Sequence, residues 1–387
     1  FFCLTLRGNI ISMVVGVVLR SHAGGYLVYQ SQLDLTLLCQ ARGRLKKERV
    51  SILTGDFVEL EDIDQEEGEA VIVSRLDRRS LLSRPQIANV DQVVIVQAVR
   101  QPEWNQLWCD RYIVHFQLEL PDSVPVLCFN KCDLVDESQK NRLREIYEGL
   151  GYKVIMVSAK TSDGVDGLLE ILRDRITVFA GPSGVGKSSL LNRLEPSLNL
   201  KIGVMDHEFG VGRHTTTYSE IYRVHLDKKC VDKEEKLAWV ADTPGFNLAE
   251  LRHPDPHDLS FQFPEILKLS RDCRFSDCLH LVEAGCNVRD HLNEGEIVPE
   301  LISQERYENY VTIVNESLGE YNLRRETSTK KESSVKTVGG KKGKSVNIPR
   351  LSGKYRAKSR RTEKQNLKVD VPDEDEYSEL EKEYNLD

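Results

Sequence analysis

One segment of the sequence has the spacing of a phosphate-binding loop. Residues 181–188 match G-x-x-x-x-G-K-[ST], after an apolar run at 176–180 and before a helix-like stretch at 189–194. Backbone N–H groups of such a loop, and the helix N-terminus behind it, attract phosphate. The residues predicted to cradle the phosphates of a nucleotide are Gly181, Pro182, Ser183, Gly184, Val185, Gly186, Lys187, Ser188 and Ser189.

Two side chains of this loop have expected roles beyond binding. Lys187 is expected to reach the β and γ phosphates and so to take part in catalysis. The Ser188 hydroxyl is expected to bind the Mg²⁺ that accompanies the nucleotide.

Two short motifs earlier in the chain predict which base is bound. Asn130-Lys-Cys-Asp133 follows an apolar run and resembles the N-K-x-D guanine motif of GTPases, and Ser158-Ala-Lys160 resembles the companion S-A-K loop. The Asp133 carboxylate can accept from guanine N1–H and the exocyclic amine, a donor pair that adenine lacks. The Ala159 N–H is expected to donate to guanine O6. The predicted base-binding residues are Asn130, Lys131, Asp133, Ser158, Ala159 and Lys160.

Two further segments are typical of nucleotide sensing. Asp242-Thr-Pro-Gly245 resembles D-x-x-G, in which the Asp approaches Mg²⁺ through water and the Gly N–H contacts the γ-phosphate. Between it and the phosphate loop lies a Gly-Arg-His-Thr-Thr-Thr run at 212–217, from which Thr216 is the preferred Mg²⁺ ligand. Loss of the γ-phosphate releases such segments in an order–disorder switch.

The order of these motifs is unusual. Ordinary GTPases place the phosphate loop first and the guanine loops last, whereas here residues 130–160 precede residues 181–188. The domain is therefore predicted to be circularly permuted, which a compact fold tolerates because its termini lie close together at the surface. The D-x-x-G segment then leads directly into the C-terminal part of the chain.

A Cys/His cluster lies in that C-terminal part. Its spacing is C-x4-C-x-H-x5-C, formed by Cys273, Cys278, His280 and Cys286. Three thiolates and one imidazole suit a closed tetrahedral Zn²⁺ site, which would stabilise a small helical module with a thin core. The spacing differs from the common C-x-x-C pairs, so four unrelated residues are the alternative interpretation.

The elements around these motifs predict several domains. Short strands with Gly-containing turns at 14–85 favour a small barrel, with basic residues in its 42–47 loop and at Arg75, Arg78, Arg79 and Arg84. Apolar runs alternating with helices from Val90 on indicate a parallel sheet. The predicted divisions are a leader remnant at 1–13, the barrel at 14–86, the nucleotide domain at 87–252, the helical module at 253–320 and a disordered tail at 321–387.

Composition excludes some classes of protein. The chain has 387 residues, 40% hydrophobic, with no apolar run long enough to span a bilayer and nine cysteines without the spacing of a disulfide framework. The net charge of −8 conceals a basic stretch at 324–364 and an acidic one at 370–387. The basic stretch is either a solvated tail or an arm that seeks RNA.

Together the permuted motifs, the barrel and the Cys/His spacing resemble the RsgA (YjeQ) family of small-ribosomal-subunit biogenesis GTPases, over residues 14–318. The resemblance implies an OB-fold barrel, a circularly permuted α/β P-loop GTPase domain and a helical zinc-binding domain. It further implies binding of GTP and GDP, rRNA contacts through the barrel, weak GTP hydrolysis stimulated by the small subunit, and a late maturation or checkpoint role. We expect the protein to be a monomer. The charged tail and the start without Met favour a chloroplast or mitochondrion, with bacterial cytoplasm as the alternative.

The group that orients the attacking water is open. Many GTPases place a Gln after D-x-x-G, where this sequence has Phe246, so slow intrinsic turnover is expected. His214 is a candidate for that role, and an rRNA contact or a turn cap is the rival interpretation. Three other functions compete: a GTP-gated RNA-binding scaffold with little turnover, a permuted GTPase of the large subunit, and an ATPase or nucleotide kinase.

Overall fold

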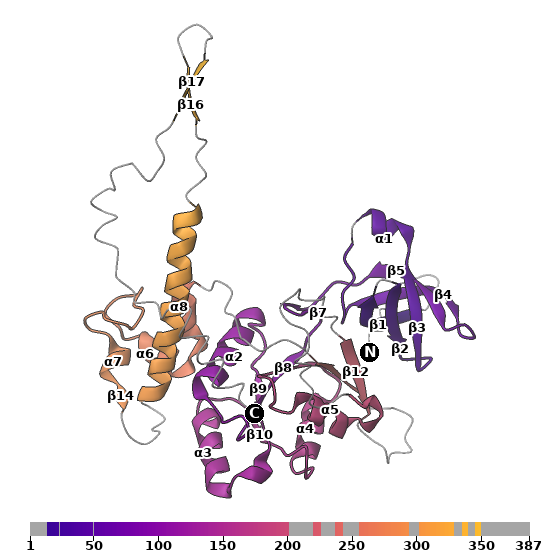
Figure 1. Cartoon of the computed structure of the whole chain (residues 1–387), viewed down its shortest axis with the longest axis horizontal. Coiled ribbons are helices and arrows are strands. Elements are labelled where there is room, and N and C mark those ends of the chain that lie inside the picture. The colour runs from indigo at the N-terminus through magenta and orange to yellow at the C-terminus, as the bar shows by residue number, and fades with distance from the viewer. Residues whose placement is uncertain are drawn as a thin grey trace, which may run out of the picture. The chain divides into compact units, whose positions relative to one another are not determined.

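The computed structural model describes residues 14–22, 24–48, 50–200, 220–225, 237–242, 255–293, 302–328, 335–339 and 345–349. They belong to two compact units, Phe1–Glu250 and Leu251–Asp387 (Figure 1). No helix in these ranges is both long and apolar enough to cross a membrane.

The first unit begins with a five-stranded barrel. Its strands are β1 Val14–His22, β2 Gly25–Gln30, β3 Leu35–Ala41, β4 Phe57–Asp64 and β5 Glu69–Arg75. β1 pairs antiparallel with both β2 and β4, and β3 pairs parallel with β5, which closes the sheet. Alternate residues of β3 are buried, as expected for strands with one face on a core. The predicted OB-type barrel is confirmed.

The basic residues of the barrel do not all lie on its surface. Arg78, which we expected in a basic face, donates to both carboxylate oxygens of Asp56, at 2.7 and 2.9 Å, and to the Ser51 carbonyl oxygen. The Asp56 side chain is fully buried, and this ion pair raises the pKa of Arg78 although burial opposes the shift. Arg78 therefore stabilises the barrel, because a buried carboxylate requires a charged partner.

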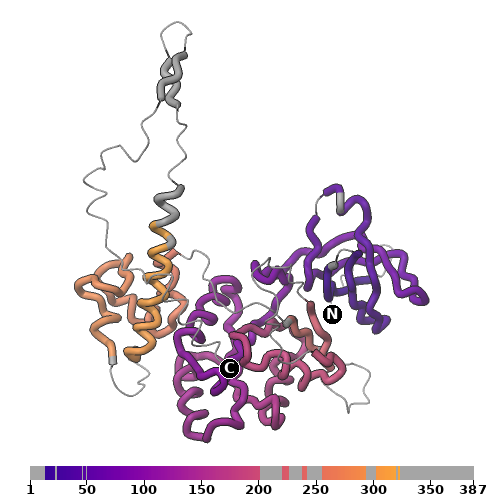
Figure 2. The backbone as a smooth tube through the Cα atoms, in the orientation of Figure 1, coloured from indigo at the N-terminus to yellow at the C-terminus, as the bar shows by residue number. Residues whose placement is uncertain are grey.

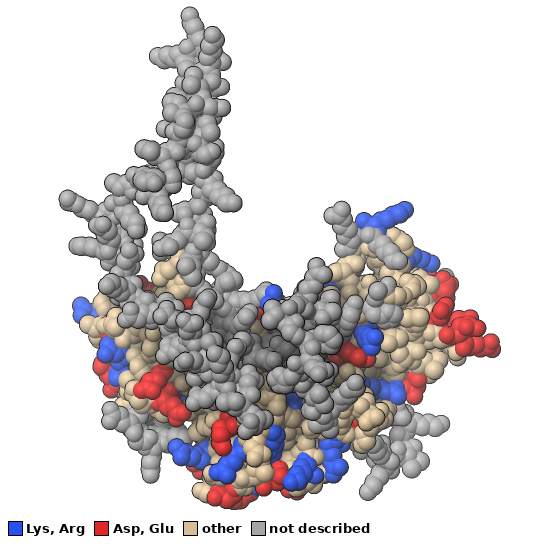
Figure 3. Space-filling view, viewed as in Figure 1, with Lys and Arg blue, Asp and Glu red and all other residues tan. Residues whose placement is uncertain are grey.

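Lys and Arg side chains do gather at the end of the barrel that carries α1, Gly43–Lys47, whereas acidic side chains gather on the β4–β5 hairpin (Figure 3). Arg44 is well exposed and pairs with Glu48 one turn away, and Arg42 pairs with Glu61. Such exposed pairs contribute little to stability and exchange readily for other partners.

A short hairpin, β6 Leu81–Ser83 and β7 Gln86–Ala88, leads from the barrel into a six-stranded sheet. The strand order of that sheet is β10-β9-β8-β11-β13-β12, parallel except for β12. The strands are β8 Gln92–Ala98, β9 Val126–Asn130, β10 Val154–Met156, β11 Ile176–Ala180, β12 Glu220–His225 and β13 Leu237–Asp242.

Helices cover both faces of this sheet, as the buried runs in β8, β9 and β11 require. One face packs on α2 Gln106–Glu119 and α3 Glu137–Glu148. The opposite face packs on α4 Val165–Leu172 and α5 Lys187–Leu194. Two 3-10 turns, Cys132–Leu134 and Pro196–Leu198, follow β9 and α5. The predicted parallel α/β domain is confirmed.

The second unit is mainly helical. Its elements are a 3-10 turn at Pro256–Gln262, α6 Pro264–Ser270, α7 Asn287–Asp290, β14 Leu292–Asn293, β15 Ile302–Ser303 and α8 Gln304–Ser328. Its small core includes Phe263 and Tyr310, whose ring centroids lie 5.3 Å apart. The buried Arg306 donates to Glu265 at 2.7 Å and lies over the Phe263 ring.

Order extends beyond the predicted end of the helical module. α8 runs to Ser328, past the boundary at 320, and strands β16 Val335–Gly339 and β17 Ser345–Pro349 pair within the segment predicted to be disordered. The helix continues because residues 320–328 contain neither Gly nor Pro, and helix propagation adds one hydrogen bond per residue fixed.

Candidate nucleotide site and metal centre

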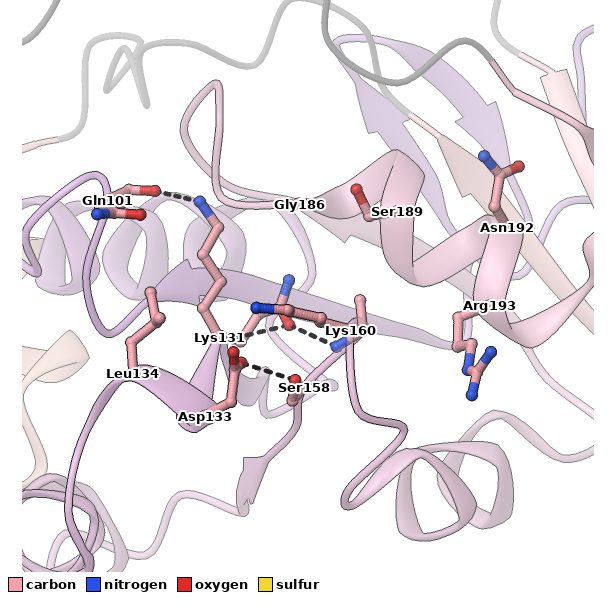
Figure 4. Close-up of a pocket in the computed structure, with 12 residues that line it drawn as sticks. Gln101, Lys131, Asp133, Leu134, Ser158, Lys160, Gly186, Ser189, Asn192 and Arg193 are labelled. Carbon is pink, nitrogen blue, oxygen red and sulfur yellow. Dashed lines mark hydrogen bonds between the residues drawn. The ribbon is translucent and has the colours of Figure 1, made fainter.

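The predicted nucleotide motifs come together at one edge of the sheet. Residues 130–133 follow β9, residues 158–160 follow β10, and residues 181–186 follow β11. β8, β9, β10 and β11 run parallel, so these loops emerge at the carboxyl edge, where open α/β sheets bind ligands. A pocket of about 480 Å³ lies there, within the size range of small-molecule sites (Figure 4).

The glycines of the phosphate loop are required by its path. Gly181 has φ +143° and Gly186 has φ +95°, values that residues with a Cβ rarely adopt. A Cβ on Gly181 would also meet the Val96 carbonyl oxygen, and one on Gly186 would meet the Asn130 side chain. α5 begins directly after Gly186, so its N-terminus faces the loop. The Lys187 ammonium donates to the carbonyl oxygens of Gly181 and Pro182, at 2.7 and 2.8 Å, and thus lies across the loop.

Asn130 ties the base loops to the phosphate loop. This side chain is almost fully buried, and its Nδ2 donates to the Val185 carbonyl oxygen at 2.9 Å. Its Oδ1 accepts from the backbone N–H groups of Lys131 and Ala159, at 2.8 and 3.1 Å. The Ala159 N–H, which we expected to face guanine O6, is directed at Asn130 in this structure. One amide thereby holds three loops in register.

Lys131 bridges the same loops from the other side. Its backbone is left-handed, with φ +63°, and its Nζ donates to the Gly184 carbonyl oxygen at 2.8 Å and to that of Gln101. Partial burial lowers the pKa of Lys131, although the Asp133 carboxylate opposes that shift. The extended lysine stem forms a wall of the pocket on which a planar base can pack (Figure 4).

The carboxylate predicted to read the base is held by the companion loop. The Ser158 hydroxyl donates to Asp133 Oδ1 at 2.7 Å, and Ser158 itself is fully buried. Ser158 also accepts from the Thr161 N–H, which fixes its orientation. Asp133 and Ser158 both line the pocket, so the carboxylate is presented to it in a fixed position.

Four lining residues escaped the sequence interpretation: Gln101, Leu134, Asn192 and Arg193. Asn192 and Arg193 share a face of α5 with Ser189, three and four residues earlier, so helical spacing could have identified them. Gln101 lies in the loop after β8, far from any motif in sequence, and only the fold brings it to the pocket.

Several predicted residues lie outside the described part of the chain. They are His214, Thr216 and Gly245, and for Asp242 the backbone at the end of β13 is described but the side chain is not. Asp242 pairs with Phe179 of β11, which places the start of the D-x-x-G segment beside the phosphate loop.

In the second unit, the four predicted metal ligands converge. The ligand atoms of Cys273, Cys278, His280 and Cys286 all lie within 4.8 Å of one another. His280 Nδ1 is 3.6 Å from Cys273 Sγ and 3.5 Å from Cys286 Sγ. Zn–S and Zn–N bonds of about 2.3 and 2.0 Å at a tetrahedral angle put ligand atoms about 3.6 Å apart, so the cluster fits Zn²⁺.

Protonation of the cluster also suits a metal. Burial lowers the pKa of His280, which favours the neutral imidazole that coordinates. Burial raises the pKa of Cys278 to about 12, so this thiol is protonated near neutral pH unless a cation stabilises its thiolate, as Zn²⁺ does.

Three residues that the sequence interpretation missed hold the backbone of the cluster. The Glu283 carboxylate accepts from the N–H groups of Leu279, Leu281 and Val282. The hydroxyls of two α8 tyrosines, Tyr307 and Tyr310, donate to the carbonyl oxygens of His280 and Leu279, at 2.7 and 3.0 Å. The α8 helix thus supports the ligand loop from behind.

The sheet, the phosphate loop and the pocket define a P-loop GTPase domain in which the N-K-x-D and S-A-K loops precede the phosphate loop. The comparison with protein families agrees: the RsgA GTPase family matches residues 75–252 and the RsgA N-terminal domain matches residues 15–72. The chain belongs to the RsgA family.

Individual relatives cover most of the chain. The small ribosomal subunit biogenesis GTPase RsgA of Carboxydothermus hydrogenoformans is 40% identical over 305 residues, 78% of this chain and 97% of that protein. The protein of the same name from Thermotoga maritima is 36% identical, covering 79% and 97%.

Solved structures are similar as well. The YjeQ crystal structure from Thermotoga maritima has a TM-score of 0.63 at 35% identity and covers 79% of this chain and 99% of its own. The crystal structure of YloQ, described as a circularly permuted GTPase, has a TM-score of 0.61 at 29% identity and covers 82% and 99%. These matches confirm the predicted family and the permuted order.

Proposed function

We propose that this protein hydrolyses GTP to GDP and phosphate and assists late maturation of the small ribosomal subunit, which stimulates the hydrolysis. One observation carries the nucleotide part: the Asp133 carboxylate, fixed by Ser158, faces the pocket that also contains Gly186 of the phosphate loop. The small ribosomal subunit is named in the descriptions of relatives that cover 78–79% of this chain.

Each part of the pocket has a role in this proposal. Asp133 accepts from guanine N1–H and the exocyclic amine, and the stems of Lys131 and Lys160 pack along the base. The loop from Gly181 to Ser189 cradles the phosphates, with Lys187 near the β and γ groups. Ser188 and Thr216 hold Mg²⁺, which neutralises phosphate charge when bound, and Asp242 and Gly245 respond to the γ-phosphate.

We assign the orientation of the attacking water to His214, because the Phe246 side chain cannot hydrogen-bond to water. His214→Ala is expected to lower the subunit-stimulated kcat by about 10²-fold or more if the imidazole acts as a general base. An unchanged stimulated kcat would eliminate that role and leave an rRNA contact as the better assignment.

The barrel and the metal centre complete the proposal. Arg42 and Arg44, at the exposed α1 end of the barrel, contact rRNA phosphates, since counterion release favours such contacts. Zn²⁺ has a structural role at Cys273, Cys278, His280 and Cys286, because all four ligand positions are filled by protein.

Monomeric state and compartment are also parts of this proposal. The reported relatives are bacterial, so they lend no support to the expected chloroplast or mitochondrion, which stays a prediction from the charged tail. Import of the chain into isolated organelles tests it, and equilibrium sedimentation tests the monomer.

The test of function is phosphate release from GTP and ATP, alone and with purified small or large ribosomal subunits. We expect GTP-selective turnover that rises sharply only with small subunits, and Lys187→Ala abolishes it. Stimulation by large subunits alone would identify the large subunit as the target of the protein. GTP binding without stimulation would favour a GTP-gated RNA-binding scaffold, and equal use of ATP would contradict the guanine assignment.

A further inference from the structure

The barrel is joined to the GTPase sheet through β12. Arg20 of β1 pairs with Glu220 of β12, so a single hydrogen-bonded sheet runs from β10 through β12 into the barrel. In Figure 2 the backbone of β12 runs up to the barrel strands. β12 begins shortly after the threonine run at 215–217, and its partner β13 ends at Asp242. The barrel thus touches the two strands that border the predicted nucleotide-sensing segments.

A cluster of side chains crosses this junction. The Arg223 guanidinium of β12 lies 4.9 Å from the ring centroid of Tyr29 of β2 and forms an ion pair with Asp34 of the barrel. The Tyr29 hydroxyl donates to the same Asp34 oxygen at 2.8 Å. The Trp239 ring of β13 lies 5.1 Å from the Tyr29 ring, and Trp239 is the cross-strand partner of Arg223. Tyr29 therefore contacts both GTPase strands.

A second contact lies in line with Asp242. Arg20 forms an ion pair with Glu220 at 3.6 Å, and Glu220 is the cross-strand partner of Asp242. Beneath the polar contacts, Val17 and Tyr29 of the barrel share a hydrophobic core with Ile221 and Ala241 of β12 and β13. A shift of the barrel therefore changes the packing of the residues next to Asp242.

From this geometry we propose that Arg223 is a positioning residue that couples the barrel to the GTPase site. Occupation of the barrel by RNA is transmitted through Asp34 and Tyr29 to Arg223, and from β12 and β13 to Asp242. The RNA ligand is taken from the function proposed above, but the coupling itself concerns only contacts within this chain.

The exposure of the Arg223–Asp34 ion pair suits a coupling role better than a structural one. The Asp34 side chain is 56% exposed and that of Arg223 is 27% exposed, so the ion pair contributes little to net stability. The shared apolar core holds the barrel in place without it. Removal of the guanidinium charge is thus expected to leave the fold intact.

Thermodynamic reciprocity supplies a test that needs no ribosome. If barrel occupancy changes the GTPase site, then nucleotide state must change the barrel by the same free energy. We therefore expect hydrogen exchange of the β1 and β2 amides to differ between GTP-analogue and GDP complexes of the full chain. In Arg223→Met, which keeps the aliphatic stem over Tyr29, that difference should vanish.

The same variant is then tested with small subunits. Basal kcat and subunit co-sedimentation should stay within about twofold of wild type, whereas the stimulation ratio should fall about tenfold, a typical coupling effect. The matched control is Arg173→Met, which removes a guanidinium just after α4 that pairs with Glu170 of that helix. Asp34→Asn breaks the same ion pair from the barrel side and should reproduce the effect of Arg223→Met. It therefore tests the coupling independently of any effect of Arg223→Met on folding.

The outcomes separate the two proposals. The coupling is overturned if Arg223→Met is stimulated fully by small subunits and still shows the nucleotide-dependent difference in hydrogen exchange. A wild-type chain that no subunit stimulates defeats the proposed function, and the exchange experiment alone then decides the coupling. The coupling through this junction is also overturned if wild type is stimulated normally but its hydrogen exchange does not differ between the two nucleotide complexes.

Discussion

The nucleotide pocket takes its residues from loops and a helix spread over positions 101–193, whereas the Cys/His cluster takes all four ligands from positions 273–286. The pocket is held by ties between loops, such as Asn130 to Val185 and Lys131 to Gly184, on a sheet buried on both faces. The cluster lies in a unit whose regular elements around it are short, apart from α8.

This difference determines what each site needs. The sheet positions the nucleotide pocket before any ligand arrives, so ligand binding energy is available for selectivity. The cluster brings three thiols and an imidazole together in a small core, where metal binding is itself part of the folding free energy. Loss of the metal should therefore disturb folding of the second unit, whereas changes in the pocket should alter nucleotide selectivity.

Metal removal should have the largest effect. Structural Zn²⁺ contributes about 10–16 kcal/mol of apparent binding free energy in small domains, so a strong chelator should abolish the cooperative unfolding of the second unit. Guanine-nucleotide affinity of the first unit should change less than about twofold, since additivity holds for separate units. Calorimetry measures the unfolding, and titration with a fluorescent GTP analogue measures the nucleotide affinity.

Cys286→Ser should act as the chelator does, whereas Cys109→Ser removes a buried thiol in the first unit and should release no zinc. Loss of nucleotide binding on chelation would contradict the separation of the two sites.

Exchange of Asp133 for Asn should have the next largest effect. Asn keeps the acceptor for the Ser158 hydroxyl but presents an N–H₂ donor to the base, so GTP preference should fall by about 10⁴-fold. Xanthosine triphosphate, with a carbonyl in place of the exocyclic amine, should bind the variant better than GTP.

The matched change Asp136→Asn preserves the N-cap of α3, where Asp136 accepts from the Gln139 N–H, and should leave base preference intact. Unaltered GTP preference in Asp133→Asn would remove Asp133 from base recognition. Competition binding with the two nucleotides decides.

Acid should have a smaller effect, a loss of stability of the first unit near the end of α5. Glu195, after α5, accepts from His225 Nδ1 at 2.8 Å and from the Ser197 hydroxyl at 2.7 Å. Burial alone would raise the pKa of Glu195, but these hydrogen bonds outweigh burial and lower it from 4.5 to about 2. The stabilisation is present above pH 4.5 and is lost as pH falls toward 2.

The expected loss is about 3 kcal/mol in the free energy of unfolding of the first unit. Denaturant titrations between pH 6 and pH 2 measure it, and Glu195→Gln should flatten the dependence in this window. Equal acid sensitivity of Glu195→Gln and wild type would show that other carboxylates carry the effect.

The smallest effect concerns the support of the metal loop. Tyr307→Phe removes the hydroxyl that donates to the His280 carbonyl oxygen, and loss of an outer partner typically weakens metal affinity by about 10–100-fold. Competition with a zinc indicator measures it. Tyr321→Phe, on an exposed part of α8, is the control and should have no effect on zinc affinity.

Much of the nucleotide site could be predicted because its motifs are short and their chemistry is local. The phosphate loop requires Gly181 and Gly186 for backbone reasons, and Asp133 follows from the donors of guanine. The position of each motif after an apolar run placed them all at one sheet edge. The metal ligands were predictable for the same reason, since all four lie within one short segment.

What the sequence by itself determined, then, is the chemistry open to contiguous segments: which loop has the glycines to wrap a phosphate, which carboxylate could pair with guanine and which side chains suit zinc. Only the tertiary structure decided the partners of residues far apart in the chain. Arg78, one basic residue among several in sequence, is committed to the buried Asp56, and Arg223 meets Asp34 across 189 positions. Charge and apolar patterning are read along the chain, but these pairs depend on which surfaces close on each other, and that is fixed by packing.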